Sequence, residues 1–481
     1  MRLRYLLIAL VTLLLAVCSC SDDDSFTTSR SNLLYFSMDT VKLDTIFSNV
    51  PTHTKSFWVY NHSGDGIRCT NIRLEHGNQT GFRVNVDGTY LGPTNGYQIN
   101  QVEIRNKDSI RVFVELTSST TFKETPQLLQ DNLLFSLESG VQQRVNLKAY
   151  SWDATLVVDY LKISHDTLLS TTKPLVIYKG IVVEEGATLT IGAGTTIYFH
   201  NDAGIDVFGR LVCNGTPEAN VILRGDRIDR MFDYLPYDNV SGQWQGIRIN
   251  ETSYDNVLQY TDIHSTYNGI SIDSCDIERS TLQMVNSTVH NCQGYGILAN
   301  HCQTSFVNCQ ITNTLCDCMS VVGGKTTING CTLAQFYPFD SNRGVALRFS
   351  SNPYPLVDFL CQNSLITGYA DDEMMAEKVD SVDFHFLFKH CIIRTPVITT
   401  DDSLYFENVI FEDIEDTISS GRKHFMKIDI DKQQYDFHLD SVSCAIGKAD
   451  AVTSMPLDRD GNMRDNEPDI GCFEFRKQQK P

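Results

Sequence analysis

Acidic side chains are the residues of this sequence that could perform acid–base chemistry on a polysaccharide. Glycoside hydrolysis needs two carboxylates at a fixed separation across the scissile bond, and a lyase needs a base together with a carboxylate cluster that binds calcium. The tight acidic groups of the repetitive second half are Asp371-Asp372-Glu373 and Asp401-Asp402. Neighbouring residues of a strand point to opposite faces, so neither group converges on one point unless it lies in a loop. The sequence therefore assigns no catalytic residue.

Aromatic and charged residues gather in one stretch, RGDRIDRMFDYLPYDNVSGQW at 224–244, and further rings lie in AQFYPFDSNRG at 334–344. Aromatic faces and planar polar groups suit sugar rings, which present CH patches and hydroxyls. The first stretch is therefore a candidate binding loop for a neutral or weakly charged glycan. The alternative is that both stretches fold back and cover the flank of their domain. The candidate ligand-binding residues are Arg227, Arg230, Phe232, Tyr234, Tyr237 and Trp244.

Cysteine chemistry is the third possibility. Beyond Cys18 and Cys20 the chain has thirteen cysteines, and no two of them form a C-x-x-C pair. The closest spacing, Cys316-Asp317-Cys318, fits neither zinc binding nor thioredoxin chemistry. We interpret these cysteines mainly as small buried apolar residues. No metal site and no cofactor is predicted.

The N-terminus carries a positive segment and then a short apolar one. Arg2 and Arg4 precede residues 6–17, an uncharged stretch too short for the ~20 residues of a spanning helix, which indicates a signal peptide. The stretch ending at Cys20 resembles a bacterial lipoprotein signal, with a small residue, Ser19, before the modified cysteine and an aliphatic residue three before it. Cys18, which lies within this stretch two residues before Cys20, departs from the family pattern. The resemblance implies that residues 1–19 are removed and that Cys20 carries the lipid.

An acidic run, Ser21-Asp22-Asp23-Asp24, follows Cys20 directly. It is similar to the surface-export signal of Bacteroidota lipoproteins. Both its acidic composition and its position directly after Cys20 favour this interpretation. The resemblance implies a lipid-anchored protein of the outer membrane that faces the cell exterior. The alternative is that residues 20–30 are only a solvated acidic tether.

Net charge restricts the partners. The chain carries a net charge of -20, and residues 1–19 hold two arginines and no acid, so the remainder has 37 basic and 59 acidic residues, a net charge of -22. Such a surface repels nucleic acid and anionic lipid headgroups. The expected partners are a membrane, through the lipid on Cys20, and a glycan ligand. No oligomeric state is predicted.

Residues 31–155 have a hydrophobic period close to two. In SIRVFVEL at 109–116, Ile110, Val112 and Val114 share one face, which is typical of a half-buried strand. Turn residues separate similar runs, and seven strands in this length favour an antiparallel β-sandwich of immunoglobulin type. As its role, we expect a spacer that holds the next domain away from the membrane. The expected strands are 33–38, 55–61, 67–74, 82–86, 109–116, 132–137 and 143–150.

Residues 156–476 repeat a short unit, seen as VNSTV, VNCQI, INGCTL, QNSLI, KHCII and ENVIF. A period of about 20 to 30 residues built from short apolar runs is typical of one turn, or rung, of a β-solenoid. In a parallel β-helix, equivalent inward positions of successive rungs form ladders of like residues. The predicted ladder of apolar anchors is Val289, Ile311, Leu333, Ile366, Ile393 and Phe411.

Two further ladders follow from the same alignment. Cys309, Cys331 and Cys391 share one repeat position, where other rungs have Ser287 and Ser364, so small inward side chains explain these cysteines. One position earlier the repeats carry asparagine, which suits a bend that needs a positive φ or side-chain amide bonding. The asparagines are Asn286, Asn308, Asn363 and Asn408.

GATLTIGAGTTIYF at 186–199 and GQWQGIRI at 242–249 resemble the opening rungs of right-handed parallel β-helix surface proteins of the pectin lyase-like class. The class includes pectate lyases and polygalacturonase-type hydrolases. The Asn-Thr-Asp, Gly-His-Gly and Arg-Ile-Lys segments of the polygalacturonases have no match here. TDIHST at 261–266 is only faintly similar to a pectate-lyase segment, and we expect His264 to be a rung side chain.

LDRDGNMRDNEPDIGCFEF, residues 457–475, is similar to the C-terminal closing rung of such proteins, and 477–481 would be a tail. A calcium loop needs six to eight oxygen ligands, and the glycine of this segment comes too early for an EF-hand. We therefore expect Asp458, Asp460 and Asn462 to form a turn and cap. The predicted fold class is all-β, an antiparallel sandwich followed by a right-handed parallel β-helix. The predicted function is non-catalytic binding or adhesion to a polysaccharide or another surface component. The first alternative is a polysaccharide lyase or glycoside hydrolase, and the second is a purely structural surface protein.

Overall fold

The computed structural model describes residues 25–232 and 234–477. The predictions for Cys18, Cys20 and Ser21 to Asp24 lie outside the described residues. The chain divides into two compact units, residues 1–153 and 154–481, and this boundary lies two residues before the expected one. Among the described residues, no helix is long and apolar enough to cross a membrane.

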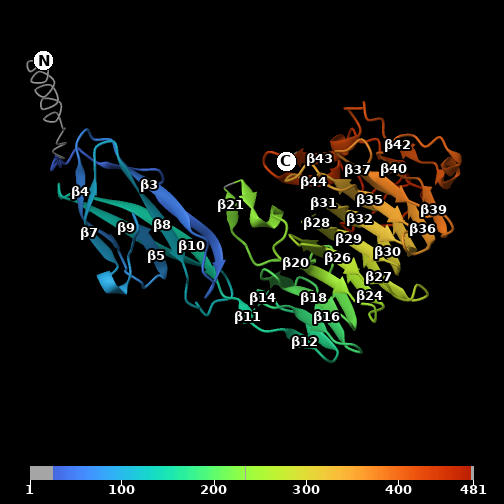
Figure 1. Ribbon diagram of the computed structural model, residues 1–481, viewed down its shortest axis with the longest axis horizontal. Coiled ribbons are helices and arrows are strands. Elements are labelled where there is room, and N and C mark those ends of the chain that lie inside the picture. The colour runs from blue at the N-terminus through green and yellow to red at the C-terminus, as the bar shows by residue number, and fades with distance from the viewer. Residues whose placement is uncertain (1–24, 233, 478–481) are drawn as a thin grey trace, which may run out of the picture. The chain divides into compact units, whose positions relative to one another are not determined.

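The first unit contains two five-stranded sheets (Figure 1). One sheet has the order β1 (Leu34–Phe36), β3 (Lys55–Asn61), β8 (Ser109–Leu116), β5 (Phe82–Val86) and β6 (Thr89–Tyr90). The other has the order β2 (Thr40–Phe47), β10 (Gln142–Trp152), β9 (Gln127–Leu137), β4 (Ile67–Leu74) and β7 (Gln98–Ile104). A short 3₁₀ helix, η1 (Pro93–Asn95), precedes β7.

The alternation in β8 places Val112, Val114 and Leu116 in a shared core, as predicted. Each of the seven expected ranges contains a strand, and the pairing is antiparallel except between β2 and β10. Sequence periodicity missed β2 because its alternation is interrupted at Asp44, whose φ is +54°, where the register with β10 shifts. It also missed β7, a largely solvated edge strand with the polar sequence QINQVEI.

The second unit is a solenoid of three long parallel sheets, which we call sheets 1, 2 and 3 (Figure 1). Sheet 1 holds β11 (Thr155–Val157), β14 (Leu175–Ile177), β17 (Thr196–Phe199), β20 (Val221–Gly225), β25 (Thr261–His264), β28 (Thr288–Cys292), β31 (Gln310–Thr314), β34 (Thr332–Gln335), β37 (Leu365–Gly368), β40 (Ile392–Ile393) and β42 (Ile410–Phe411). Sheet 2 holds β12 (Leu161–Ile163), β15 (Ile181–Val183), β18 (Gly204–Val207), β23 (Gly246–Ile249), β26 (Ile270–Ile272), β29 (Ile297–Asn300), β32 (Met319–Val322), β35 (Leu347–Ser350) and β38 (Met374–Glu377). Sheet 3 holds β13 (Thr167–Leu169), β16 (Thr188–Gly192), β19 (Arg210–Asn214), β24 (Asn256–Gln259), β27 (Ser280–Val285), β30 (Gln303–Val307), β33 (Gly324–Asn329), β36 (Leu356–Gln362), β39 (Phe384–Lys389) and β41 (Phe406–Glu407).

Elements outside the three sheets are short. Two hairpins, β21 (Arg230–Phe232) with β22 (Leu235–Pro236) and β43 (Phe425–Asp429) with β44 (Gln434–Leu439), project from the rungs. Three 3₁₀ helices complete the unit: η2 (Tyr237–Asn239), η3 (Asp401–Tyr405) and η4 (Gly421–His424).

Each predicted apolar anchor pairs with the next in the register of sheet 1, from Val289 on β28 to Phe411 on β42. Like residues of successive rungs stack on one another and fill the solenoid core continuously. Each rung therefore packs on its neighbours and not on distant parts of the chain, as it would in a globular domain. The predicted apolar ladder and the all-β fold class are confirmed.

The cysteine and asparagine ladders are also confirmed. Cys309, Cys331 and Cys391 are fully buried free thiols at one rung position, shared with Ser287 and Ser364. The four predicted asparagines all have positive φ, between +48° and +54°, and form the corner that leads into sheet 1. Asparagine tolerates this left-handed conformation because its short amide can bond locally.

The expected closing rung is wrong. Instead of adding a turn to the end of the solenoid, residues 440–475 run back along its flank as a strap. Side-chain amides of the asparagine corner and of Asn329, at the end of β33, bond the backbone of the strap, and one strap side chain bonds a rung hydroxyl. The contacts in chain order are Asn363 Oδ1 with Asp450 N (2.8 Å), Asn329 Nδ2 with Thr453 O (2.8 Å), Asn308 Nδ2 with Leu457 O (2.7 Å) and Arg459 Nε with Thr288 Oγ1 (2.9 Å).

The strap also buries apolar side chains on the outer surface of sheet 1. Phe336 and Leu365 of the rungs pack with Phe437 of β44 and with Ile470 and Phe473 of the strap. Within the strap, the Asp458 carboxylate accepts the backbone N–H groups of Asp460 and Asn462 at 3.0 and 2.7 Å. The turn expected at these residues is confirmed.

Candidate functional site

Two neighbouring strands of sheet 1, β25 and β28, place a cluster of ionisable side chains on its outer surface. Ile263 and Val289 point into the core, so the residues on either side of each point outward. The register pairs Asp262 with Thr288 and His264 with His290. Asp262, His264 and His290 therefore lie side by side, although they come from different rungs.

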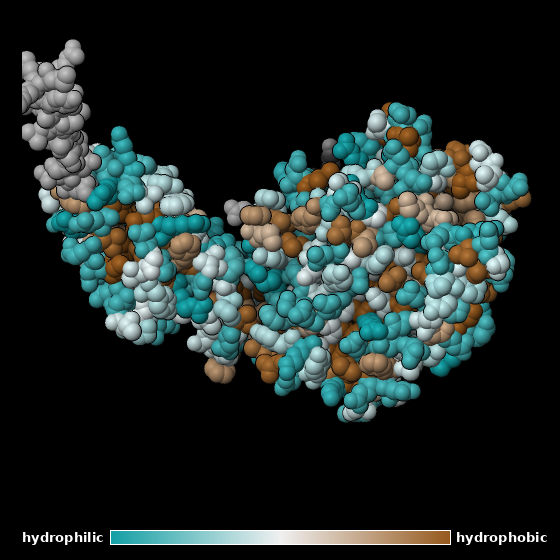
Figure 2. All heavy atoms as spheres, in the orientation of Figure 1, coloured by the Kyte–Doolittle hydropathy of each residue, from teal (hydrophilic) through white to brown (hydrophobic). Residues whose placement is uncertain are grey.

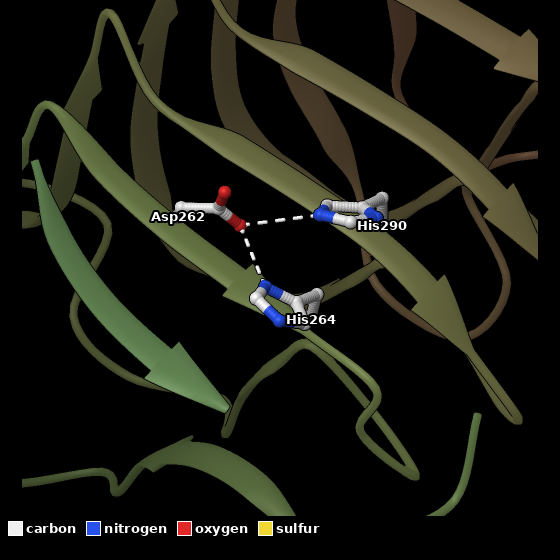
Figure 3. A group of neighbouring side chains, drawn as sticks. All are labelled: Asp262, His264 and His290. Atoms are coloured by element: carbon white, nitrogen blue, oxygen red, sulfur yellow. Dashed lines mark hydrogen bonds and ion pairs between the residues drawn. The ribbon is translucent and has the colours of Figure 1, made fainter. Parts of the chain in front are cut away.

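One oxygen of the Asp262 carboxylate faces a ring nitrogen of each imidazole (Figure 3). Its Oδ1 is 2.9 Å from Nδ1 of His264 and 3.2 Å from Nε2 of His290. The two rings are stacked, with centroids 4.8 Å apart and planes inclined by 28°. One carboxylate oxygen is thus the common focus of two ring nitrogens.

A second carboxylate lies behind the cluster. Asp238 Oδ1, from the insertion that follows β20, is 3.5 Å from Nε2 of His264 and forms an ion pair with Arg224. Burial alone would lower the pKa of His264, but the charge of Asp262, its hydrogen bond to the ring and the nearby Asp238 carboxylate raise it to about 9. Burial alone would raise the pKa of Asp262, but the two histidines hold it well below its usual range.

The cluster opens into a cleft of about 440 Å³. Its floor is the outward face of β25, β28 and β31, where Gln310 and Thr312 continue the row begun by Thr288 and His290. Asn239 of the insertion, residues 433–437 of the β43–β44 hairpin, and Arg459, Asp460 and Phe473 of the strap form the walls. Figure 2 shows hydrophilic side chains over the solenoid, interrupted by scattered hydrophobic ones.

Three segments far apart in the sequence hold these walls together. Asn239 Nδ2 donates to the carbonyl of Gln433 at 2.6 Å, joining the insertion to the hairpin. Ser241 and Tyr337 share a hydrogen bond of 2.8 Å, so the two aromatic stretches of the sequence contact each other. The walls of the cleft therefore come from segments outside the repeat, whereas its floor is the repeat itself.

The structure divides the predicted binding residues. Phe232 and Tyr234 are about half exposed and stack on each other with planes 11° apart. Arg230 is exposed beside them, whereas Arg227 covers the ring of Tyr237 at 3.8 Å and pairs with Asp229. None of these five predicted residues lines the cleft.

Trp244 does not belong to an exposed surface, contrary to its placement among the candidate ligand-binding residues. Its ring is 1 % exposed and stacks on Phe199 in the solenoid core, with centroids 4.2 Å apart. Its indole N–H donates to the carbonyl of His264 at 2.8 Å. Trp244 begins the return of the insertion to sheet 2, so the inward alternation of the rung has already resumed there.

The acidic groups singled out in the sequence do not form a catalytic pair. Glu373 is fully buried and accepts the backbone N–H groups of Ala370 and Ala346 at 2.7 and 3.0 Å. Asp371 and Asp372 are exposed, and Asp401 and Asp402 begin the exposed helix η3. His264 is a rung side chain, as expected, but it belongs to the cluster at the cleft.

One comparison with known proteins supports the β-helix fold of the second unit. A profile of the right-handed β-helix region matches residues 156–333, and such domains occur in polysaccharide-degrading and surface proteins. No curated protein matches the chain. A family 123 glycoside hydrolase from Clostridium perfringens aligns over 26% of this chain and 26% of its own, with 5% identity and a TM-score of 0.18. The seventh PapD-like domain of human CEP192 aligns over 29% of this chain and 96% of its own, with 10% identity and a TM-score of 0.17.

Proposed function

We propose that this protein is a cell-surface glycan-binding protein whose ligand lies in the cleft on sheet 1. The observation that carries the proposal is the chemistry of the lining. Side-chain amides, hydroxyls, an imidazole and a guanidinium line the cleft together with the rings of Tyr435 and Phe473. These groups can donate to and accept from sugar hydroxyls, and the rings can pack on CH faces.

The size of the cleft and the number of polar groups in its walls suit an extended or branched saccharide. A cavity of about 440 Å³ lies within the usual range of small-molecule sites. Amide side chains come from the floor, the insertion and the hairpin, for example Gln310, Asn239 and Gln434. They favour a ligand that is recognised by many neutral hydrogen bonds. The exposed pair Phe232 and Tyr234 is a second place where a long chain could rest outside the cleft.

The proposed location is the outer face of an outer membrane. Cys20 would carry the lipid, and Asp22 to Asp24 would direct the chain to the surface, with the β-sandwich as spacer. A glycan-binding cleft is useful to a cell only where glycans can reach it, so this placement agrees with the proposed ligand.

The test is retention of the full-length chain on a panel of immobilised polysaccharides, followed by affinity measurement with any retained glycan. The cleft variant combines Gln310→Ala and Gln434→Ala, and the matched rim variant combines Phe232→Ala and Tyr234→Ala. Each lost neutral hydrogen bond is worth about 0.5–1.5 kcal/mol, so the cleft variant should bind about 5- to 150-fold more weakly. Loss in the rim variant alone would move the site to the insertion, and no retention by the unaltered chain would refute glycan binding.

A second candidate function is acid–base catalysis on the bound saccharide, as in a lyase or hydrolase. The observation that favours it is the pairing of His290 with Asp262 at 3.2 Å on the floor of the cleft, because a carboxylate that orients an imidazole is a common acid–base arrangement. The same panel decides between the two. Release of new reducing ends or unsaturated products, lost in His290→Ala, would identify an enzyme.

A further inference from the structure

We propose that Asp262, His264 and His290 form a binding site for a divalent transition-metal ion at the floor of the cleft. The inference concerns the ion alone and does not rest on glycan binding, because it is measured without glycan. Carboxylate and imidazole donors are the set that zinc and its neighbours in the first transition row prefer. The sequence contains no metal-binding motif because the ligands come from two rungs.

The three donor atoms are already gathered. One oxygen of Asp262 and one nitrogen of each histidine all lie within 4.8 Å of one another. Ligands of a tetrahedral zinc site at bond lengths of about 2.0–2.2 Å are separated by about 3.3–3.6 Å. The observed separations of 2.9 and 3.2 Å from the carboxylate oxygen need to open by only a few tenths of an ångström.

The parallel register explains why the rings can share one ion. His264 and His290 are partners on adjacent strands, which fixes their stacking at 4.8 Å, and Asp262 lies two residues before His264 on the same outward face. Rigid strands hold such a set better than loops do. Three protein ligands leave the remaining coordination position for water or a ligand, and Asp262 and His290 both line the cleft.

Asp238 supplies the outer support that metal-binding histidines usually have. If Nδ1 of His264 binds the ion, its Nε2–H faces Asp238 Oδ1 at 3.5 Å. A carboxylate in this position orients the ring and raises its basicity as a ligand. The two nearby arginines pair with other carboxylates. Arg224 forms an ion pair with Asp238, and Arg459 lies 3.6 Å from Asp460, so neither cation is paired with Asp262.

A second group of donors, Glu75, His76 and Asp131 in the β-sandwich, makes a useful comparison. Asp131 of β9 is fully committed to protein hydrogen bonds, because its carboxylate accepts from the backbone N–H groups of His76 and Asn132 and from the hydroxyl of Thr80. The carboxylate of Asp262, in contrast, faces the two imidazoles and the cleft. We therefore assign the ion to the solenoid cluster.

The test is calorimetric titration of the chelator-treated full-length chain with Zn²⁺ at pH 8, since the ion must displace imidazole protons. We expect one ion per chain. Binding should be lost in Asp262→Asn and His290→Ala and weakened about 10- to 100-fold in Asp238→Asn. His200→Ala is the matched control, because His200, directly after β17 of sheet 1, pairs with a single carboxylate, Asp226.

Two further measurements protect the interpretation. His290→Gln retains a polar side chain on a folded rung, and it should melt like the unaltered chain yet lose the ion. Co²⁺ should give visible d–d absorption in the unaltered chain and in His200→Ala, and none in His290→Gln. No saturable Zn²⁺ binding, binding that survives in His290→Gln, binding lost instead in His76→Ala, or a preference for Ca²⁺ would each overturn the proposal.

Discussion

Glu373 is a fully buried carboxyl directly before β38. Burial raises its pKa from about 4.5 to about 8, although the N–H groups of Ala370 and Ala346 and the charges of Arg343 and Arg394 oppose the shift. The folded state therefore keeps the proton that the unfolded chain releases above pH 4.5. The stability from this group is complete below pH 4.5 and is lost as pH rises through 8, by up to about 1.4 kcal/mol per pH unit.

We predict that Glu373→Gln removes this slope. The free energy of unfolding, measured by denaturant at several values between pH 6.5 and 8, should fall less steeply in the variant than in the unaltered chain. Asp469, whose pKa burial raises to about 6, affects both chains alike and mainly below this window. Equal slopes in the two proteins would show that Glu373 ionises normally in the fold.

Trp244 and the pair Phe232 and Tyr234 should respond differently to truncation. Trp244→Ala removes a ring packed on Phe199 and should destabilise the solenoid by about 3–5 kcal/mol. Truncating Phe232 or Tyr234 should change stability by about 0.5 kcal/mol or less, because both rings are largely solvated. Denaturant unfolding of the three single variants measures this. A similar cost for all three would contradict the division of the insertion into a buried anchor and an exposed rim.

Residue types in the insertion could be recognised from sequence, but their exposure could not. The aromatic residues at 232, 234 and 244 look alike in a linear pattern. Only residue 244 lies where the chain returns to the rung and its side chains again alternate inward and outward. The cluster at the cleft did leave a signal. Ile263 extends the apolar ladder one rung before Val289, and this step would have placed His264 beside His290.

Ladders are the level at which sequence and structure agree most closely. Each rung repeats the same inward and outward positions, so alignment of the repeats fixes register without any knowledge of the loops. Periodicity failed for β7, a polar edge strand that is largely solvated. It also failed for β2, whose alternation is interrupted where its register with β10 shifts. It also failed for the strap, because a segment that crosses rungs has no period of its own.

The cysteine ladder makes a chemical prediction. Cys309, Cys331 and Cys391 should resist thiol reagents in the native chain and react after unfolding, because they are fully buried and burial raises the pKa of the Cys331 thiol. Neighbouring rungs lie about 4.8 Å apart, so a bridge between Cys309 and Cys331 is sterically possible. Mass spectrometry of freshly isolated protein is the measurement. A Cys309–Cys331 disulfide would disprove the free-thiol ladder.

The proposed lipid anchor belongs to the scale of the whole molecule, since it would decide where both units work. Cys20→Ala should abolish lipid labelling, whereas Cys18→Ala should not, because Ser19 is small enough to precede the cleavage site and Val17 is less so. Replacing Asp22 to Asp24 by alanine should leave the lipid in place but hide the chain from external protease. Loss of label in the Cys18 variant alone, or unchanged surface cleavage without the aspartates, would contradict these assignments.

At the scale of the molecule, the solenoid, the insertion, the hairpin and the strap together form one cleft. Repeats supply a rigid floor, and the segments that break the repeat supply the walls, which join through Asn239 and Gln433. Sequence patterns predict the floor because it is periodic. They could not predict the cleft, because its walls come from residues near 240, 433 and 460 whose meeting depends on the path of the strap.

Hydrogen–deuterium exchange of the full-length chain, with and without a retained glycan, tests the central claim most directly. Glycan bound in the cleft should protect backbone amides at 288–291, 310–313 and 433–435 and leave 230–234 unchanged. Protection confined to 230–234, or to the β-sandwich, would contradict a binding site on the outer face of sheet 1.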